Sequence, residues 1–237
     1  MATTYPSTIY RHRLPTRLWH WTNALCLYVL FTSGLGIFNA HPRLYWGEYG
    51  ANFDPAWLEL GRFPAWLTLP ASYDLALSRH WHLLTTPIFL FSLLAYMLTS
   101  HGNGHFRRDF AFRKWELAPS HLWRDIKDHA RLRFPTGEAA AHYNVLQKIA
   151  YLKVLFLLLP ILILTGLAMS PGMDAAWPWL TQMWGGRQTA RSVHFLFAWG
   201  TLAFFLVHIA MVALAGPINE VRSMMKGWFR LPPDREI

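Results

Sequence analysis

Residues 191–215 read RSVHFLFAWGTLAFFLVHIAMVALA, and this stretch decides the fold class. Apart from Arg191 at its start and the histidines at 194 and 208, it consists almost entirely of apolar and small residues. Crossing the hydrocarbon core of a membrane takes about 20 mostly apolar residues in a helix, because no water is present there to satisfy the backbone. The stretch therefore predicts a membrane-spanning helix over 193–215.

Three other stretches, 18–38, 80–99 and 149–170, have the same character. The whole chain is 53% hydrophobic and 15% charged, which is unusual for a soluble protein. Tryptophans gather near the ends of the stretches, as they do in the aromatic belts at membrane interfaces. We therefore predict an all-α membrane protein in which residues 1–237 form a single bundle of four transmembrane helices.

The first stretch is not expected to be a signal peptide, since its apolar run is too long and His20 and Asn23 lie near its start. The single cysteine, Cys26, lies in the middle of this stretch. One cysteine excludes an intramolecular disulfide, a covalent CxxCH haem attachment and an iron–sulfur cluster supplied by this chain alone.

The net charge of +9 is distributed by membrane side. Most lysines and arginines lie before residue 18, between residues 100 and 148, or after residue 215, while the two other connections carry few. Cytoplasmic loops are the ones enriched in Lys and Arg, so both termini and the middle connection are predicted to be cytoplasmic. Because the basic residues do not form one surface, we do not expect nucleic-acid binding.

Two segments outside the spans have helical features. Residues 55–69, within the long aromatic connection 39–79, could form a short interfacial helix broken at Pro64. Residues 120–131 are predicted to form a helix with Ser120 as its N-cap.

Four histidines lie within the predicted spans, at positions 20, 82, 194 and 208. His194 and His208 are 14 residues apart, a rise of about 21 Å and roughly 40° short of four full turns, so they point from one face at two depths. The direction of each span pairs His20 with His208 and His82 with His194. Facing histidines on neighbouring helices suit the axial ligation of a haem iron, so we predict two haems inside the bundle. The alternative is that each histidine only hydrogen-bonds a neighbouring helix.

An arginine precedes three of these histidines by three residues: Arg17 before His20, Arg79 before His82 and Arg191 before His194. A residue at i−3 shares the helix face one turn nearer the water, where a guanidinium would meet haem propionates. This spacing favours His82 over His80 as the ligand. Arginines are also common at the ends of membrane helices, which would explain the spacing without a haem.

Gly34 follows His20 by 14 residues, so it lies on about the same helix face at the depth of the second haem. A glycine there would admit a porphyrin edge, or it would allow two helices to pack closely. The two interpretations have equal support from the sequence.

The chain resembles the bacterial cytochrome b561 superfamily, which includes b-type subunits of nickel–iron hydrogenases, formate dehydrogenase and thiosulfate reductase. The resemblance rests on four features: residues 17–21 (RLWHW), residues 79–82 (RHWH), residues 143–148 (YNVLQK) and the histidine pair of the fourth span. Residues 105–109 (HFRRD) are similar to cytochromes that accompany periplasmic molybdopterin oxidoreductases. The resemblance implies two non-covalent haems b, a quinone site and a location in the bacterial inner membrane.

A polar helix face opens the third span, with Asn144, Gln147, Lys148 and Tyr151 at i, i+3, i+4 and i+7. Helix capping and snorkelling explain such a face without a ligand. The resemblance instead implies that Asn144 and Lys148 bind ubiquinone or menaquinone beside the His20/His208 haem. Leu146, where relatives tend to have glycine, departs from that pattern.

We expect an electron-transfer subunit that connects the quinone pool to a periplasmic redox subunit, a molybdopterin oxidoreductase or similar, and no catalytic residue is assigned. A self-sufficient superoxide:quinone oxidoreductase is a second hypothesis, which catalysis by the isolated chain would support. A third is a histidine-lined transporter or proton channel, which predicts a colourless protein.

Overall fold

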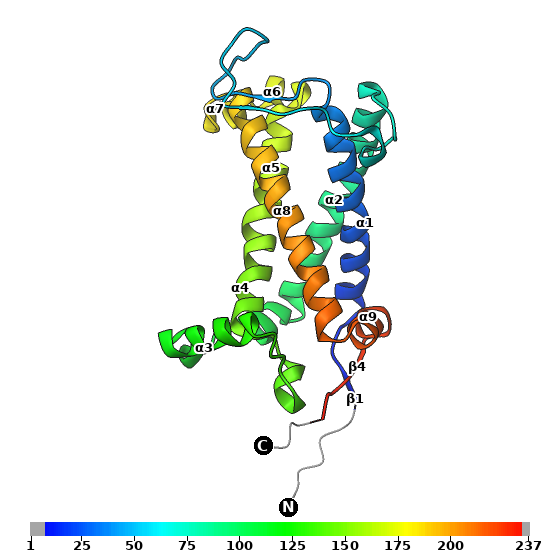
Figure 1. Cartoon of the computed structure of the whole chain (residues 1–237), viewed down its shortest axis with the longest axis vertical. Helices are drawn as coiled ribbons and strands as arrows, with labels where there is room; N and C mark the ends of the chain where they lie inside the picture. Colours follow the sequence, from blue (N-terminus) through cyan, green and yellow to red (C-terminus); the bar gives the residue numbers. More distant parts are fainter. Residues whose placement is uncertain (1–7, 234–237) are drawn as a thin grey trace, which may run out of the picture. The chain divides into compact units, whose positions relative to one another are not determined.

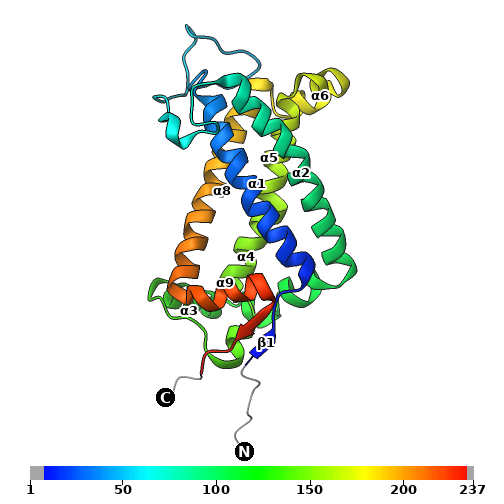
Figure 2. The ribbon, with the colours of Figure 1, turned by 90° about the vertical axis from the view of Figure 1, so that its right-hand side faces the viewer.

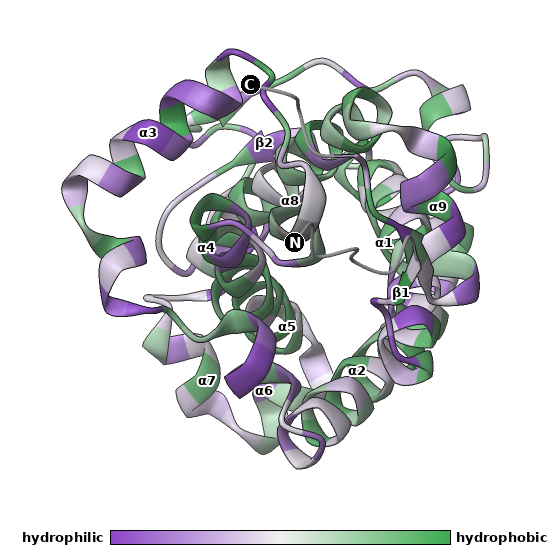
Figure 3. Cartoon of the chain, turned by 90° about the horizontal axis from the view of Figure 1, so that it is seen from below, coloured by the Kyte–Doolittle hydropathy of each residue, from purple (hydrophilic) through white to green (hydrophobic). Residues whose placement is uncertain are grey.

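The computed structural model describes residues 8–233 (Figure 1). Four helical stretches in this range are long and apolar enough to cross a membrane: α1 (Leu14–Phe38), α2 (Leu75–Gly102), Ala139–Met169 and α8 (Arg187–Ala215). The third consists of α4 (Val145–Lys153), the π-helical η5 (Val154–Leu158) and α5 (Leu159–Met169), preceded by the 3-10 helix η4 (Gly137–Ala141). Figure 3 shows hydrophobic colour over much of α5 and α8, as a lipid-facing helix requires.

The helices extend several residues beyond the predicted spans, whose own boundaries stay a prediction. α1 begins at Leu14 rather than 18, α2 begins at Leu75 rather than 80, and α8 begins at Arg187 rather than 193. The length of an apolar run indicates only the part of a helix that lies in the lipid, and helical hydrogen bonding continues beyond that part. The π-helical turn η5 ends two residues before Pro160, whose missing N–H removes one backbone donor.

The chain divides into two compact units, and each receives segments of all four long helices. The His82 unit comprises residues 22–93 and 155–203. Besides its helix segments it contains β2 (Arg43–Leu44) paired antiparallel with β3 (Leu58–Glu59), the 3-10 helix η1 (Ala65–Leu67), α6 (Pro171–Ala176) and α7 (Pro178–Met183). Residues 55–69 therefore contain a short strand and a 3-10 turn instead of the interfacial helix. Pro64 prevents a helix from continuing through it, and η1 ends before Thr68, whose backbone is extended.

The His20 unit comprises the described residues of 8–21, 94–154 and 204–233. Its β1 (Thr8–Tyr10) pairs antiparallel with β4 (Trp228–Arg230), next to α9 (Pro217–Lys226) (Figure 2). The middle connection contains the π-helical η2 (Phe106–Phe110), the 3-10 helix η3 (Lys114–Leu117) and α3 (Pro119–Ala130), which packs on α4. The predicted helix 120–131 thus begins one residue earlier. Ala118 is its N-cap and Pro119 its first residue, a position where proline's fixed φ and missing N–H fit well, so Ser120 is not the cap.

Candidate functional site

The imidazoles of His82 and His194 face each other within the His82 unit. Their ring centroids are 6.3 Å apart and the planes are inclined by 61°. His82 lies on α2 and His194 on α8, as the sequence predicted, while His80 is exposed. His82 rather than His80 therefore faces His194, and the choice of His82 as the haem ligand stays a prediction.

A buried hydroxyl lies against the Nδ1 atom of each ring. Ser33 Oγ is 3.0 Å from His82 Nδ1, and Thr165 Oγ1 is 2.9 Å from His194 Nδ1. Each hydroxyl is also 2.6 Å from the carbonyl oxygen four residues earlier, of Val29 and Ile161 respectively. Because the hydroxyl hydrogen donates to that carbonyl, the hydroxyl accepts from the Nδ1–H. Both Nε2 atoms are then left with a lone pair for a metal.

A glycine follows each hydroxyl residue and lies beside the same imidazole. A Cβ atom added at Gly34 would be 3.7 Å from His82 Cε1, and one at Gly166 would be 3.5 Å from His194 Cε1. Both are ordinary van der Waals distances. The neighbour of Gly34 is therefore the His82 ring, and the predicted contact of Gly34 with a porphyrin edge stays a prediction.

His20 and His208 form the corresponding pair in the His20 unit. Their ring centroids are 6.2 Å apart with planes inclined by 58°. Phe204 lies nearly parallel to His208 at 5.9 Å, and Tyr151 meets it edge-on at 6.5 Å. In contrast to His82 and His194, the buried Nδ1 of His20 has no hydrogen-bond partner within the described residues.

Both pairs fit a bis-histidine haem. Metal–imidazole bonds of roughly 2 Å on opposite sides of one iron place the ring centroids about 6 Å apart, the separation found in both pairs. Among residues 8–233 no group of three or more His, Cys, Asp or Glu side chains could hold a bare ion. Two facing imidazoles suit a metal whose other ligands come with a planar macrocycle.

The three arginines have different surroundings. Arg17 Nη1 donates to the Met225 carbonyl at 2.6 Å, and its buried Nε has no partner among the described residues. Arg191 donates to the His41 carbonyl, and its guanidinium lies 5.9 Å from the Phe38 ring centroid. Arg79 is exposed. The predicted role of the three in binding haem propionates stays a prediction.

Asn144 and Lys148 are engaged in contacts within the His20 unit. Asn144 caps α4: its Oδ1 accepts from Gln147 N at 2.9 Å, while Gln147 Oε1 accepts from Asn144 N at 3.2 Å. The Lys148 ammonium donates to both carboxylate oxygens of Glu116, at 2.8 and 2.9 Å, and to the Ala111 carbonyl at 3.1 Å. Burial acts to raise the pKa of Glu116, but hydrogen bonds from Lys148 and the Arg113 backbone outweigh it and lower that pKa.

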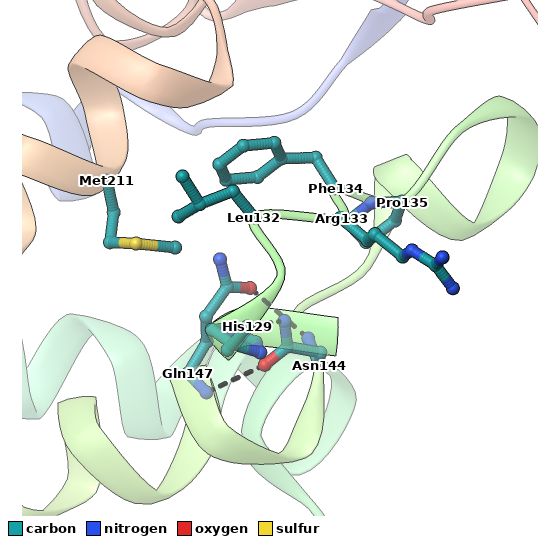
Figure 4. Close-up of a pocket in the computed structure, with 8 residues that line it drawn as sticks. All are labelled: His129, Leu132, Arg133, Phe134, Pro135, Asn144, Gln147 and Met211. Carbon is teal, nitrogen blue, oxygen red and sulfur yellow. Dashed lines mark hydrogen bonds between the residues drawn. The ribbon is translucent and has the colours of Figure 1, made fainter. Parts of the chain in front are cut away.

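A small pocket lies beside the α4 cap. Figure 4 shows the amides of Asn144 and Gln147 at this pocket together with Met211, which lies one turn after His208 on α8. Its other lining residues are His129, Leu132, Arg133, Phe134 and Pro135. The pocket combines amide groups with apolar walls, as small-molecule sites usually do.

Two histidines outside the spans are buried. His105 is 7% exposed, and its Nδ1 lies 2.6 Å from Asp109 Oδ2. His12 is 5% exposed, and burial followed by the neighbouring Arg11 lowers its pKa to about 3. The i,i+4 spacing of His105 and Asp109 was a sequence signal for their pairing.

The family model for prokaryotic cytochrome b561 matches residues 11–227. A probable Ni/Fe-hydrogenase B-type cytochrome subunit of Cupriavidus necator is 26% identical over 92% of this chain and 86% of its own length. A putative protein-methionine-sulfoxide reductase subunit, YedZ1, of Azospira oryzae is 27% identical over 84% of this chain and 87% of its own length. No solved structure gives a significant match.

Proposed function

Because the chain belongs to the prokaryotic cytochrome b561 family, we propose that it carries electrons between the quinone pool and a partner redox enzyme through two haems b. The observation that supports this most directly is the facing of two histidine pairs at the separation a bis-histidine iron requires. Each haem, when bound, supplies a one-electron Fe(III)/Fe(II) couple.

The chain's own residues hold and orient these groups. His20 and His208 are the axial ligands of one haem, and His82 and His194 are those of the other. The apolar helices exclude water from both, and Arg17, Arg79 and Arg191 are in our proposal the partners of the propionates.

The protein is a multi-pass protein of the bacterial inner membrane with both termini in the cytoplasm. The concentration of basic residues before α1, between α2 and α4, and after α8 supports this orientation. The His82/His194 haem then lies nearer the periplasm and the His20/His208 haem nearer the cytoplasm.

The partner is a periplasmic redox subunit. The names of the relatives support two kinds of partner, a Ni/Fe hydrogenase and a protein-methionine-sulfoxide reductase, and do not support the molybdopterin oxidoreductase expected from the sequence. The partner docks on the connection between α1 and α2, whose aromatic side chains at Trp46, Tyr49, Phe53 and Trp66 are 52–102% exposed.

The quinone, ubiquinone or menaquinone, binds beside the His20/His208 haem at the pocket of Figure 4. Asn144 is the polar contact for a quinone carbonyl, supported by its position on the pocket wall. Since the Lys148 ammonium already makes three hydrogen bonds, we assign Lys148 the supporting part of fixing the start of α4.

Absorption spectra and haem content of the purified full chain test the proposal. His82→Ala and His194→Ala should each lose one haem and keep the other, and His20→Ala and His208→Ala should lose the converse one. His80→Ala is the matched control and should keep both. A colourless wild-type protein would refute the proposal and favour a histidine-lined transporter. Loss of a haem in His80→Ala but not in His82→Ala would overturn the ligand assignment.

A further inference from the structure

We propose that Ser33 and Thr165 are positioning residues that hold His82 and His194 in the Nδ1–H tautomer and lower the reduction potential of the haem bound between them. The inference rests on the proposed function in that it requires a haem at this pair. It concerns two hydroxyls on α1 and α5, neither of which comes from a helix that carries the ligands of this haem.

The arrangement occurs twice with the same local sequence. Ser33-Gly34-Leu35 on α1 meets His82, and Thr165-Gly166-Leu167 on α5 meets His194. In each case the hydroxyl contacts Nδ1 and the following glycine lies beside Cε1 of the same ring. Two different helices thus present one hydroxyl–glycine pair to each imidazole of a single site.

Each hydroxyl can only accept a hydrogen bond from the imidazole, because its own hydrogen is donated elsewhere. Each donates to the carbonyl four residues earlier, so only its lone pairs face the imidazole. Ser33 and Thr165 are both fully buried, at 0% exposure, and water therefore does not compete for the Nδ1–H. Each Nδ1 must donate, to the hydroxyl and also to the backbone carbonyl of Leu30 for His82 or of Leu162 for His194, and Nε2 is the only ring nitrogen with a free lone pair.

Serine and threonine in membrane helices often bond back to their own helix without further purpose. This chain offers examples for comparison. Thr32 is the neighbour of Ser33 and bonds back to Tyr28, and Thr201 on α8 bonds back to Phe197. No hydrogen bond to a histidine is found for either of them within residues 8–233. Ser33 and Thr165 differ from them in the second contact, to an imidazole that faces another imidazole.

The hydroxyls influence the iron through the electron density of the ligand. An Nδ1–H that donates a hydrogen bond makes the imidazole a more basic ligand at Nε2, and a more basic ligand favours Fe(III) over Fe(II). The buried His20 Nδ1 lacks such an acceptor among the described residues. Removal of the hydroxyls should therefore raise the potential of one haem and leave the other unchanged.

Redox titration of the purified full chain, followed by haem absorbance, tests this inference. The loss of one neutral hydrogen bond in Ser33→Ala or Thr165→Ala should shift the equilibrium of one haem up to about tenfold toward Fe(II), a rise of up to about 59 mV for one electron. Thr165→Ser and Ser33→Thr keep a hydroxyl and should restore the wild-type potential. Thr32→Ala and Thr201→Ala remove a back-bond without a histidine contact and should change neither haem.

Wild-type potentials in a haem-replete Ser33→Ala/Thr165→Ala variant would overturn the inference, as would a shift in the haem that His82→Ala retains. If the double variant loses haem, Thr165→Val keeps the shape of the side chain and gives the same readout; a wild-type potential there overturns the inference equally. A wild-type protein without haem would refute the proposed function, whereas two titrating haems that ignore these substitutions would refute only the role of the hydroxyls.

Discussion

We predict that the buried ion pair between Lys148 and Glu116 stabilises the start of α4. Both residues are 7% exposed, and the shorter N–O distance is 2.8 Å. At an effective dielectric constant of about 20, two unit charges at this distance attract by about 6 kcal/mol, part of which offsets the cost of removing them from water. Removing one partner strands the other charge in a buried position. Glu116→Gln or Lys148→Met should therefore lower the free energy of unfolding by about 3–5 kcal/mol.

The assay is denaturant unfolding of the detergent-solubilised protein, followed by tryptophan fluorescence. The matched control is the double variant Glu116→Leu/Lys148→Met, which removes both charges and should recover most of the lost stability, because no charge is then left unpaired. Single variants within about 1 kcal/mol of wild type, or a double variant whose loss equals the sum of the single losses, would refute the assignment of a tight buried pair.

The same variants separate two roles for Lys148. If Lys148 only fixes α4, the double variant should reduce its haems with added quinol at the wild-type rate. If the ammonium binds the quinone directly, as the resemblance implied, quinol-driven haem reduction should remain slow in the double variant despite its recovered stability.

Three further predictions concern the quinone, acid and the partner. Asn144→Ala should slow haem reduction by added quinol while both haem spectra stay intact; unaltered kinetics would move the quinone site away from the pocket. The free energy of unfolding should fall on acidification. Burial acts to raise the pKa of Asp109, but hydrogen bonds from His105 and Arg108 outweigh it and lower that pKa. The contribution of Asp109 to stability is therefore complete above pH about 4 and is lost as the pH falls through the lowered pKa. Asp109→Asn should make the free energy of unfolding less dependent on pH in the acid range, and an unchanged pH dependence would refute this role of Asp109. Tyr49→Ser/Phe53→Ser should reduce partner-dependent turnover without changing haem content, and full turnover would place the docking surface elsewhere.

The sequence by itself determined the features that depend only on residues close together in the chain, which are the membrane-spanning helices and the positions of the histidines along them. A run of apolar residues must be a helix if it crosses lipid, so the four spans were readable without a structure. Fixed helical rise put His194 and His208 at two depths of one helix, and the alternating directions of the spans then paired them with His82 and His20. Both pairings are found.

Only the tertiary structure decided what surrounds those histidines. The hydroxyls that meet His82 and His194 lie 49 and 29 residues away in the sequence, on helices that bring no ligand to the site, and no periodicity within one helix reports a contact with another. The same holds for Lys148, whose polar helix face was visible in the sequence but whose partner Glu116 comes from a 3-10 turn 32 residues earlier. A side chain's position on a helix is fixed locally, because rise and turn per residue are constant, whereas its partner is fixed by which helices pack together, and that depends on the whole chain.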